Sequence, residues 1–190
     1  TGSNDWIAVI HADGNGLGQI VQKIGTDADQ FKNFSQLLDK ATVQAAVNAY
    51  NQVSSGIDSK VIPMRPIVLG GDDLTVICRA DLAVSYVKCF INEFQIQTQE
   101  ELGDILNENN VFAGNINYLT ACAGIAYVKS SFPFYYGYSL AESLCSYAKT
   151  DAKAALNEGE LPASCIMFHK VQDSFVDTYK EIVDRELKPQ

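Results

Sequence analysis

Two acidic motifs in the sequence have residue types and spacing that suit metal-dependent chemistry. Asp13 follows the apolar run 6–12 and opens the segment DGNGLG, and Asp72 and Asp73 separate two apolar runs in PIVLGGDDLTVICR (66–79). Adjacent carboxylates on a tight turn repel each other, and a plain hairpin needs only Asn-Gly or Asp-Gly. The aspartate pair therefore indicates a ligand that favours two negative charges in one place.

Three carboxylates that converge on one point are suited to hard divalent cations such as Mg²⁺ or Mn²⁺. Two such ions about 3.5–4 Å apart can activate a 3′-hydroxyl and stabilise a departing pyrophosphate. Gly14 and Gly16 have no side chains to block a triphosphate, and their amides can donate to phosphate oxygens. Lys149 and Lys153 are four residues apart on an expected helix, so they share a face that can neutralise phosphates.

Composition limits the classes of protein to which the chain can belong. Its 190 residues are 47% hydrophobic, enough for one buried domain over 5–190, with 1–4 as a cloning remnant or a domain edge. The net charge of −9 argues against a domain that mainly neutralises nucleic-acid phosphates. No apolar run has the length of a membrane span and no signal-peptide pattern is present, so we expect a cytoplasmic protein with no membrane partner.

The cysteines and histidines do not form a metal-binding pattern. The five cysteines are scattered through apolar stretches without a C-x-x-C pair, which is typical of reduced, buried thiols. His11 and His169 also lie in apolar runs, and we expect His11 to be a hydrogen-bonded core residue. A zinc site is therefore not expected.

The elements that must position the aspartates follow from hydrophobic periodicity. Strands are expected at 6–12, 61–69, 74–79, 118–128 and 164–169, and helices at 34–53, 82–94, 139–156 and 173–187, with a polar connection at 98–117. Ser35 and Asp81 are candidate N-caps, and the two prolines of 61–69 place that strand at a sheet edge.

This order predicts an α+β fold with a ferredoxin-like βαββαβ core, to which a C-terminal strand and helices are added. Helices are expected on one face of a mainly antiparallel sheet. In this topology the first strand lies beside the hairpin, so that Asp13 can meet Asp72 and Asp73.

Three segments together, HADGNGLG, LGGDDLTVI and AESLCSYAKTDAKAAL, resemble the palm or cyclase domain of the large catalytic subunit of type III CRISPR effector complexes. That domain is related to GGDEF diguanylate cyclases. The resemblance covers roughly residues 6–170 and implies a nucleotidyl cyclase that binds ATP with two Mg²⁺ or Mn²⁺ ions and forms 3′–5′ phosphodiester bonds, giving a cyclic oligoadenylate-type product. It implies metal ligation by Asp13, Gly14 (through its carbonyl), Asp72 and Asp73, and nucleotide contacts at Asn15, Gly16, Ser35, Gly70, Gly71, Lys149 and Lys153.

The chain departs from the GGDEF pattern in ways that favour ATP over GTP. Leu74 stands where GGDEF has phenylalanine, Asp73 replaces its glutamate, and no R-x-x-D motif precedes the hairpin. From the resemblance we expect the nuclease domain, a second palm and the zinc module of the CRISPR subunit to lie outside these 190 residues. Because a bond needs two nucleotides, we expect a homodimer or a partner palm, and contact with effector subunits and guide RNA only through those other domains.

Other interpretations remain open. The hairpin could be an ordinary exposed turn, and DGNGLG lacks the G-x-G-x-x-G spacing of a dinucleotide site. As a calcium loop it fails at Leu17 and Ile24. A diguanylate cyclase that uses GTP and a non-catalytic nucleotide-sensing or scaffold domain both stay as alternatives. Tyr135, Tyr136 and Tyr138 could stack on a base or serve packing, and Ser35 could read a base edge as well as cap a helix.

Overall fold

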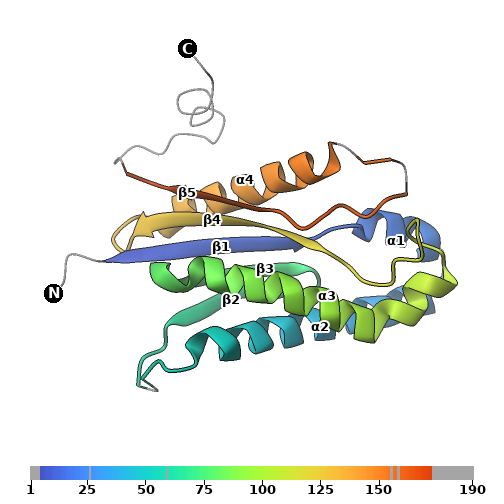
Figure 1. The fold of residues 1–190 in the computed structure, drawn as a ribbon, viewed down its shortest axis with the longest axis horizontal. Helices are drawn as coiled ribbons and strands as arrows, with labels where there is room; N and C mark the ends of the chain where they lie inside the picture. The colour runs from blue at the N-terminus through green and yellow to red at the C-terminus, as the bar shows by residue number, and fades with distance from the viewer. Residues whose placement is uncertain (1–4, 26, 59, 155, 158, 173–190) are drawn as a thin grey trace, which may run out of the picture.

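The computed structural model describes residues 5–25, 27–58, 60–154, 156–157 and 159–172 (Figure 1). The expected terminal helix at 173–187 lies outside these residues. In chain order the elements are β1 (Trp6–Gly14), α1 (Leu17–Ile24), α2 (Ala28–Ser54), β2 (Met64–Gly70), β3 (Asp73–Arg79), the 3₁₀ turn η1 (Ala80–Leu82), α3 (Ala83–Glu108), β4 (Ala121–Lys129), α4 (Phe134–Lys153) and β5 (Ile166–Lys170). No helix among them is long and apolar enough to cross a membrane.

The five strands form one sheet in the order β2-β3-β1-β4-β5. β1 pairs antiparallel with both β3 and β4, and β5 adds to β4 in parallel. The first four strands therefore have the predicted ferredoxin-like arrangement, with β1 beside the hairpin. β2 is the edge strand, and its register shifts between Pro66 and Val68, as expected of a strand whose proline cannot donate to the ladder.

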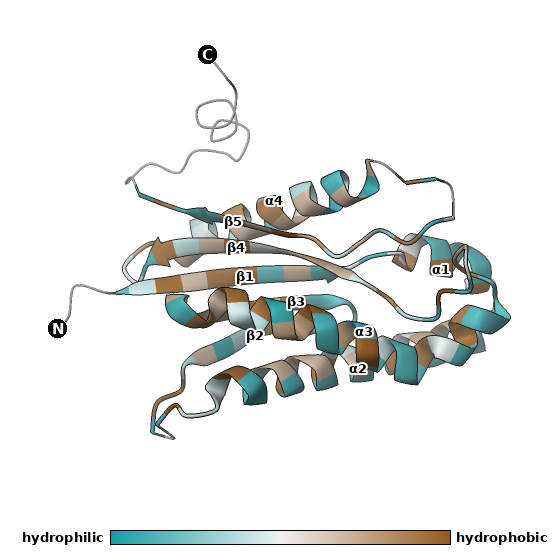
Figure 2. Cartoon of the chain, in the orientation of Figure 1, coloured by the Kyte–Doolittle hydropathy of each residue, from teal (hydrophilic) through white to brown (hydrophobic). Residues whose placement is uncertain are grey.

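Helices cover both faces of the sheet, which corrects the expectation of a single covered face. Ala8, Ile10 and Ala12 of β1 belong to the core under α2 and α3, whereas Val9 packs with Leu140 and Leu144 of α4. Figure 1 shows α4 on one side of the sheet and α2 with α3 on the other. Because the central strand is buried on both sides, its sequence is a continuous apolar run rather than an alternating one. Figure 2 accordingly shows most of β1 and β4 in hydrophobic colours.

Several element boundaries differ from those expected. α2 begins at Ala28 with Asp27 as its N-cap, so Ser35 lies inside the helix and does not cap it. Asp81 is not a side-chain cap either: its carboxylate accepts two hydrogen bonds from Arg79. α3 continues to Glu108 through much of the expected polar connection, because Thr98, Leu102 and Leu106 remain buried.

Candidate active site

The register of the sheet places the first aspartate against the hairpin. Asp13 and Asp73 are direct partners between β1 and β3, and the Gly14 amide donates to the Asp72 carbonyl at 3.2 Å. One carboxylate oxygen from each of Asp13, Asp72 and Asp73 lies within 4.8 Å of the others. Asp13 and Asp72 are half-buried and Asp73 is exposed. The predicted convergence of the three carboxylates is confirmed.

This acidic cluster changes the protonation of its members. Burial, a hydrogen bond with Asp13 and repulsion from Asp13 and Asp73 raise the pKa of Asp72 to about 7. Burial and the charge of Asp13 also raise the pKa of Asp73, while His11 and Lys149 oppose that shift. Like charges held this close favour a bound cation, and three oxygen donors are a suitable set for Mg²⁺ or Mn²⁺.

Lys149 reaches the cluster from α4, which covers the face of the sheet opposite to α2 and α3. Its Nζ lies 2.5 Å from Asp13 Oδ2 and donates to the Gly14 carbonyl at 2.8 Å. Lys153 lies one turn further along α4 and is exposed. The two lysines therefore differ in position: Lys149 is inside the site, and Lys153 is at its margin.

A cavity of about 480 Å³ opens beside the aspartates, between β1 and α4. Its walls include His11 and Asp13 of β1 and Glu142, Ser146 and Lys149 of α4. The ring of His11 shares a 3.0 Å hydrogen bond with Thr75, as expected, and packs edge-on against Tyr138, but it is half-buried in the cavity wall rather than in the core. This volume is in the range of small-ligand sites.

Gly14 at the end of β1 and Gly16 just after it are needed for close packing as well as for access. A Cβ on Gly14 would lie 2.9 Å from Asp72 Cβ, and one on Gly16, whose φ is +88°, would lie 2.6 Å from the Phe112 ring. The Gly14 amide is already bonded to the Asp72 carbonyl, so the expectation that it donates to phosphate is wrong. The sequence motif thus serves the approach of the hairpin to the strand.

Asn15, expected to contact the nucleotide, is 1% exposed. Its side-chain amide donates to Thr120 Oγ1 at 3.0 Å and its backbone amide to the Thr120 carbonyl at 2.8 Å. The side chain therefore holds the loop after β1 against the segment before β4.

Two residues of α2 that were not among the predicted site residues hold the hairpin turn. The Gly71 amide donates to Asp39 Oδ1 at 3.1 Å, and the hydroxyl of the buried Thr42 donates to the Gly71 carbonyl at 2.6 Å. Gly71 has φ of +59°, a conformation that favours glycine. Ser35 lies one turn before Asp39 on the same face of α2. Only the packing of α2 against the hairpin identifies Asp39 and Thr42, since neither stands in a recognisable motif.

The family model for the second palm domain of Cas10/Cmr2 matches residues 6–157. The chain belongs to this family. Because the matched domain is the second palm, the expectation that the second palm lies outside these 190 residues is wrong. A comparison with curated proteins found no match.

Solved structures share the fold of this Cas10/Cmr2 palm domain. A Csm1-Csm4 cassette in complex with cA4 aligns with a TM-score of 0.52 and 14% identity over 77% of this chain and 20% of that chain. A bacterial light-regulated adenylyl cyclase aligns with a TM-score of 0.50 and 8% identity over 77% of this chain and 41% of the other. The GGDEF domain of DgcB from Caulobacter crescentus, in complex with c-di-GMP, aligns with a TM-score of 0.47 and 11% identity over 85% and 77% of the two chains.

The TM-scores of the first two structures show a common fold. The chain spans about a fifth of the length of the Csm1-Csm4 cassette chain that it matches. The predicted family and the predicted palm fold are both confirmed.

Proposed function

We propose that this palm domain is a nucleotidyl cyclase that binds ATP with two divalent cations and forms 3′–5′ phosphodiester bonds, giving a cyclic oligoadenylate-type product. The observation that carries the proposal is the junction of β1 with the β2–β3 hairpin, where three carboxylates lie within 4.8 Å of one another and Lys149 contacts Asp13. Membership of the Cas10/Cmr2 family supports the same assignment.

The residues present fit the two Mg²⁺ or Mn²⁺ ions of the proposal. Asp13, Asp72 and Asp73 would hold them, with the Gly14 carbonyl as a further oxygen donor that Lys149 occupies in this structure. When bound, the ions would supply charge neutralisation at the phosphates and activation of the 3′-hydroxyl. The carboxylates carry the proton that is lost on metal binding, since the pKa of Asp72 is about 7 without metal.

The nucleotide contacts of the proposal come from three directions. Lys149 would turn from Asp13 to the triphosphate, with Lys153 at the outer end of the same helix face. Gly70 and Gly71 would leave the hairpin without side chains next to bound metal ions, and Gly16 would do the same at the start of α1. Ser35, exposed on α2 near the turn, would reach the base.

One palm presents one nucleotide, whereas bond formation requires two in contact. We therefore include a second palm in the proposal, from a second copy or a partner chain. The solved Csm1-Csm4 cassettes, described as complexes with cA4, AMPPNP and ATP, favour adenine over guanine and an effector-subunit partner.

Incubation of the protein with radiolabelled ATP or GTP and Mn²⁺, followed by separation of the products, tests the proposal. Cyclic or linear oligoadenylate from ATP is the expected result. Product from GTP alone would identify a diguanylate cyclase, and nucleotide binding without turnover, with a partner palm present, would identify a sensing or scaffold domain.

A matched pair of variants shows whether the aspartate cluster performs the reaction. Asp73→Asn removes a carboxylate of the cluster, and Asp81→Asn removes an exposed one that pairs with Arg79. Product formation should be lost in the first and kept in the second.

A further inference from the structure

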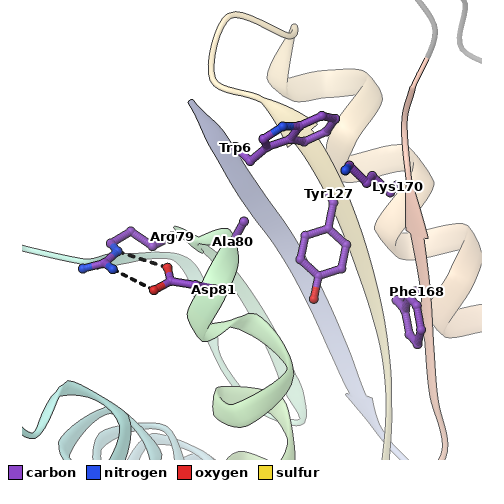
Figure 3. Close-up of a pocket in the computed structure, with 7 residues that line it drawn as sticks. All are labelled: Trp6, Arg79, Ala80, Asp81, Tyr127, Phe168 and Lys170. Atoms are coloured by element: carbon purple, nitrogen blue, oxygen red, sulfur yellow. Dashed lines mark hydrogen bonds and ion pairs between the residues drawn. The ribbon is translucent and has the colours of Figure 1, made fainter. Parts of the chain in front are cut away.

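A second cavity lies at the opposite end of the sheet from the aspartates. It has a volume of about 650 Å³ and is lined by residues that include Trp6, Arg79, Asp81, Tyr127, Phe168 and Lys170 (Figure 3). Trp6 begins β1 and Asp13 stands seven residues later, so the two sites are about 23 Å apart at the rise of an extended strand. We call this cavity the aromatic groove.

The groove is the part of a sheet face that no described helix covers. Tyr127 pairs with Ala8, and Phe168 pairs with Ile125; both partners belong to the core under α2 and α3. Tyr127 and Phe168 therefore point to that face. α4 covers the other face, and Phe168 remains 65% exposed. A large apolar ring at this exposure, next to two other aromatic rings, forms a surface that favours a partner.

The rim of the groove is positively charged, although the whole chain is acidic at −9. Lys129 and Lys170 place their Nζ atoms 4.2 Å and 4.5 Å from the centre of the Trp6 ring. Arg79 forms a bidentate salt bridge with Asp81, which is the only acidic side chain among the described residues that line the groove. A ligand with apolar and acidic groups is complementary to this surface.

We propose that the chain's own segment 173–187 lies in the aromatic groove. The segment begins three residues after Lys170, the last residue of β5, which itself lines the groove. Its sequence, DSFVDTYKEIVDREL, places Phe175, Tyr179 and Ile182 at helical spacing. It also carries five carboxylates and two cations, so its charge is opposite to that of the rim.

The position of the segment favours it over any separate molecule. Phe175 follows Lys170 by five positions, so the connecting chain can span no more than about 17 Å. A short tether of this kind gives an effective concentration in the millimolar range, which a partner in solution rarely matches. Packing in the groove would also stabilise the segment, because an isolated helix of this length is marginally stable in water and needs an apolar surface on which to pack.

Trp6 is the single tryptophan of the chain, so its fluorescence reports on the groove alone. The experiment compares the full chain with its Ile182→Asp variant, which places a charge in the apolar stripe of the segment. If the segment covers the groove, the emission of Trp6 shifts to longer wavelength in the variant and acrylamide quenches it more strongly. Lys180→Gln changes the net charge by the same amount on the opposite face of the expected helix, since two positions correspond to about 200°, and it should keep the parent spectrum.

Identical emission and quenching in the parent and Ile182→Asp would overturn the proposal, provided that far-UV circular dichroism shows both proteins folded. A difference that depends on protein concentration would also overturn it, because it would identify a second copy as the occupant. Quenching of the parent's Trp6 by added single-stranded RNA, without an effect of Ile182→Asp, would assign the groove to a nucleic acid instead. The groove variant Phe168→Asp gives an independent check, since it should expose Trp6 as much as Ile182→Asp does.

Discussion

Asp13 and Asp72 differ in how the protein compensates their charge. Asp13 has the ammonium of Lys149 at 2.5 Å, whereas Asp72 has mainly the neighbouring carboxylates and a pKa of about 7. Asp13 is therefore paired with a cation in the metal-free site, whereas burial and the neighbouring carboxylates disfavour the charge of Asp72. Such a cost is characteristic of a site whose residues serve binding rather than folding.

Replacing Asp72 with Asn should make the metal-free protein more stable at pH 8, by roughly 1–3 kcal/mol. A carboxyl whose folded pKa is raised contributes stability that is complete below its unfolded pKa of 3.8 and is lost as the pH rises through about 7. The gap between variant and parent should therefore narrow between pH 8 and pH 4. Thermal unfolding in EDTA across this range measures it.

The same Asp72→Asn variant should lose most of the stabilisation that Mn²⁺-ATP gives the parent, because one metal ligand is gone. Asp81→Asn, at the other end of the sheet, is the control and should behave as the parent does in both measurements. A variant that is less stable at pH 8 yet keeps the full ligand-induced shift would make Asp72 a turn residue, and the metal site would be wrong.

Lys149 should matter more than Lys153 for nucleotide affinity. Lys149→Ala removes a half-buried ammonium inside the cluster, and the loss of a charge-assisted hydrogen bond of about 1.5–3 kcal/mol corresponds to roughly 10–100-fold in affinity. Lys153→Ala removes an exposed charge, so its effect should stay within about fivefold. Titration of both variants with ATP and Mn²⁺ decides the ranking, which equal or reversed losses would contradict.

At the scale of elements, α2 positions the hairpin that carries two of the three aspartates. Asp39 and Thr42 bond to the two polar backbone groups of Gly71, and the Gly14 amide holds the Asp72 carbonyl from the side of β1. The turn is thus fixed between a helix and a strand that are distant in sequence. This arrangement sets the distance between the carboxylates, on which metal binding depends.

Thr42→Val should weaken Mn²⁺-nucleotide binding more than a general loss of stability would. The change keeps the shape of the side chain but removes its hydrogen bond to the Gly71 carbonyl, worth about 1 kcal/mol. Thr98→Val is the matched control. Thr42 and Thr98 are both buried in helices, and the hydroxyl of each donates to the carbonyl four residues earlier, but Thr98 accepts from the Leu119 amide before β4 and not from the hairpin. Equal losses of metal affinity in the two variants would show a general effect of stability.

At the scale of the molecule, the proposed reaction requires a second palm. Two nucleotides must meet for a bond to form, and an acidic chain at −9 opposes self-association unless a specific surface overcomes the repulsion. We therefore expect the isolated protein to turn over slowly, with a rate per chain that rises with protein concentration. Product formation over a concentration series, with sedimentation at the same concentrations, measures this. A constant rate per chain in a monomeric protein would contradict it.

The sequence alone determined the strands, the hairpin and the meeting of Asp13 with Asp73. These follow from apolar runs bounded by glycines and from the crossover rule, which leaves few ways to connect β1 with the hairpin. Local patterns also predicted the family, because the motifs lie on the loops that the fold brings together.

Tertiary structure alone decided what surrounds the aspartates. An apolar stripe shows that α4 must pack on something, but not which face of the sheet it covers; that depends on the surface that α2 and α3 leave open. The choice brings Lys149 to Asp13. The burial of Asn15 and the bonds from Asp39 and Thr42 to Gly71 have the same origin. Each joins residues far apart in the chain, and side-chain spacing carries no information on such pairs until the layers are packed.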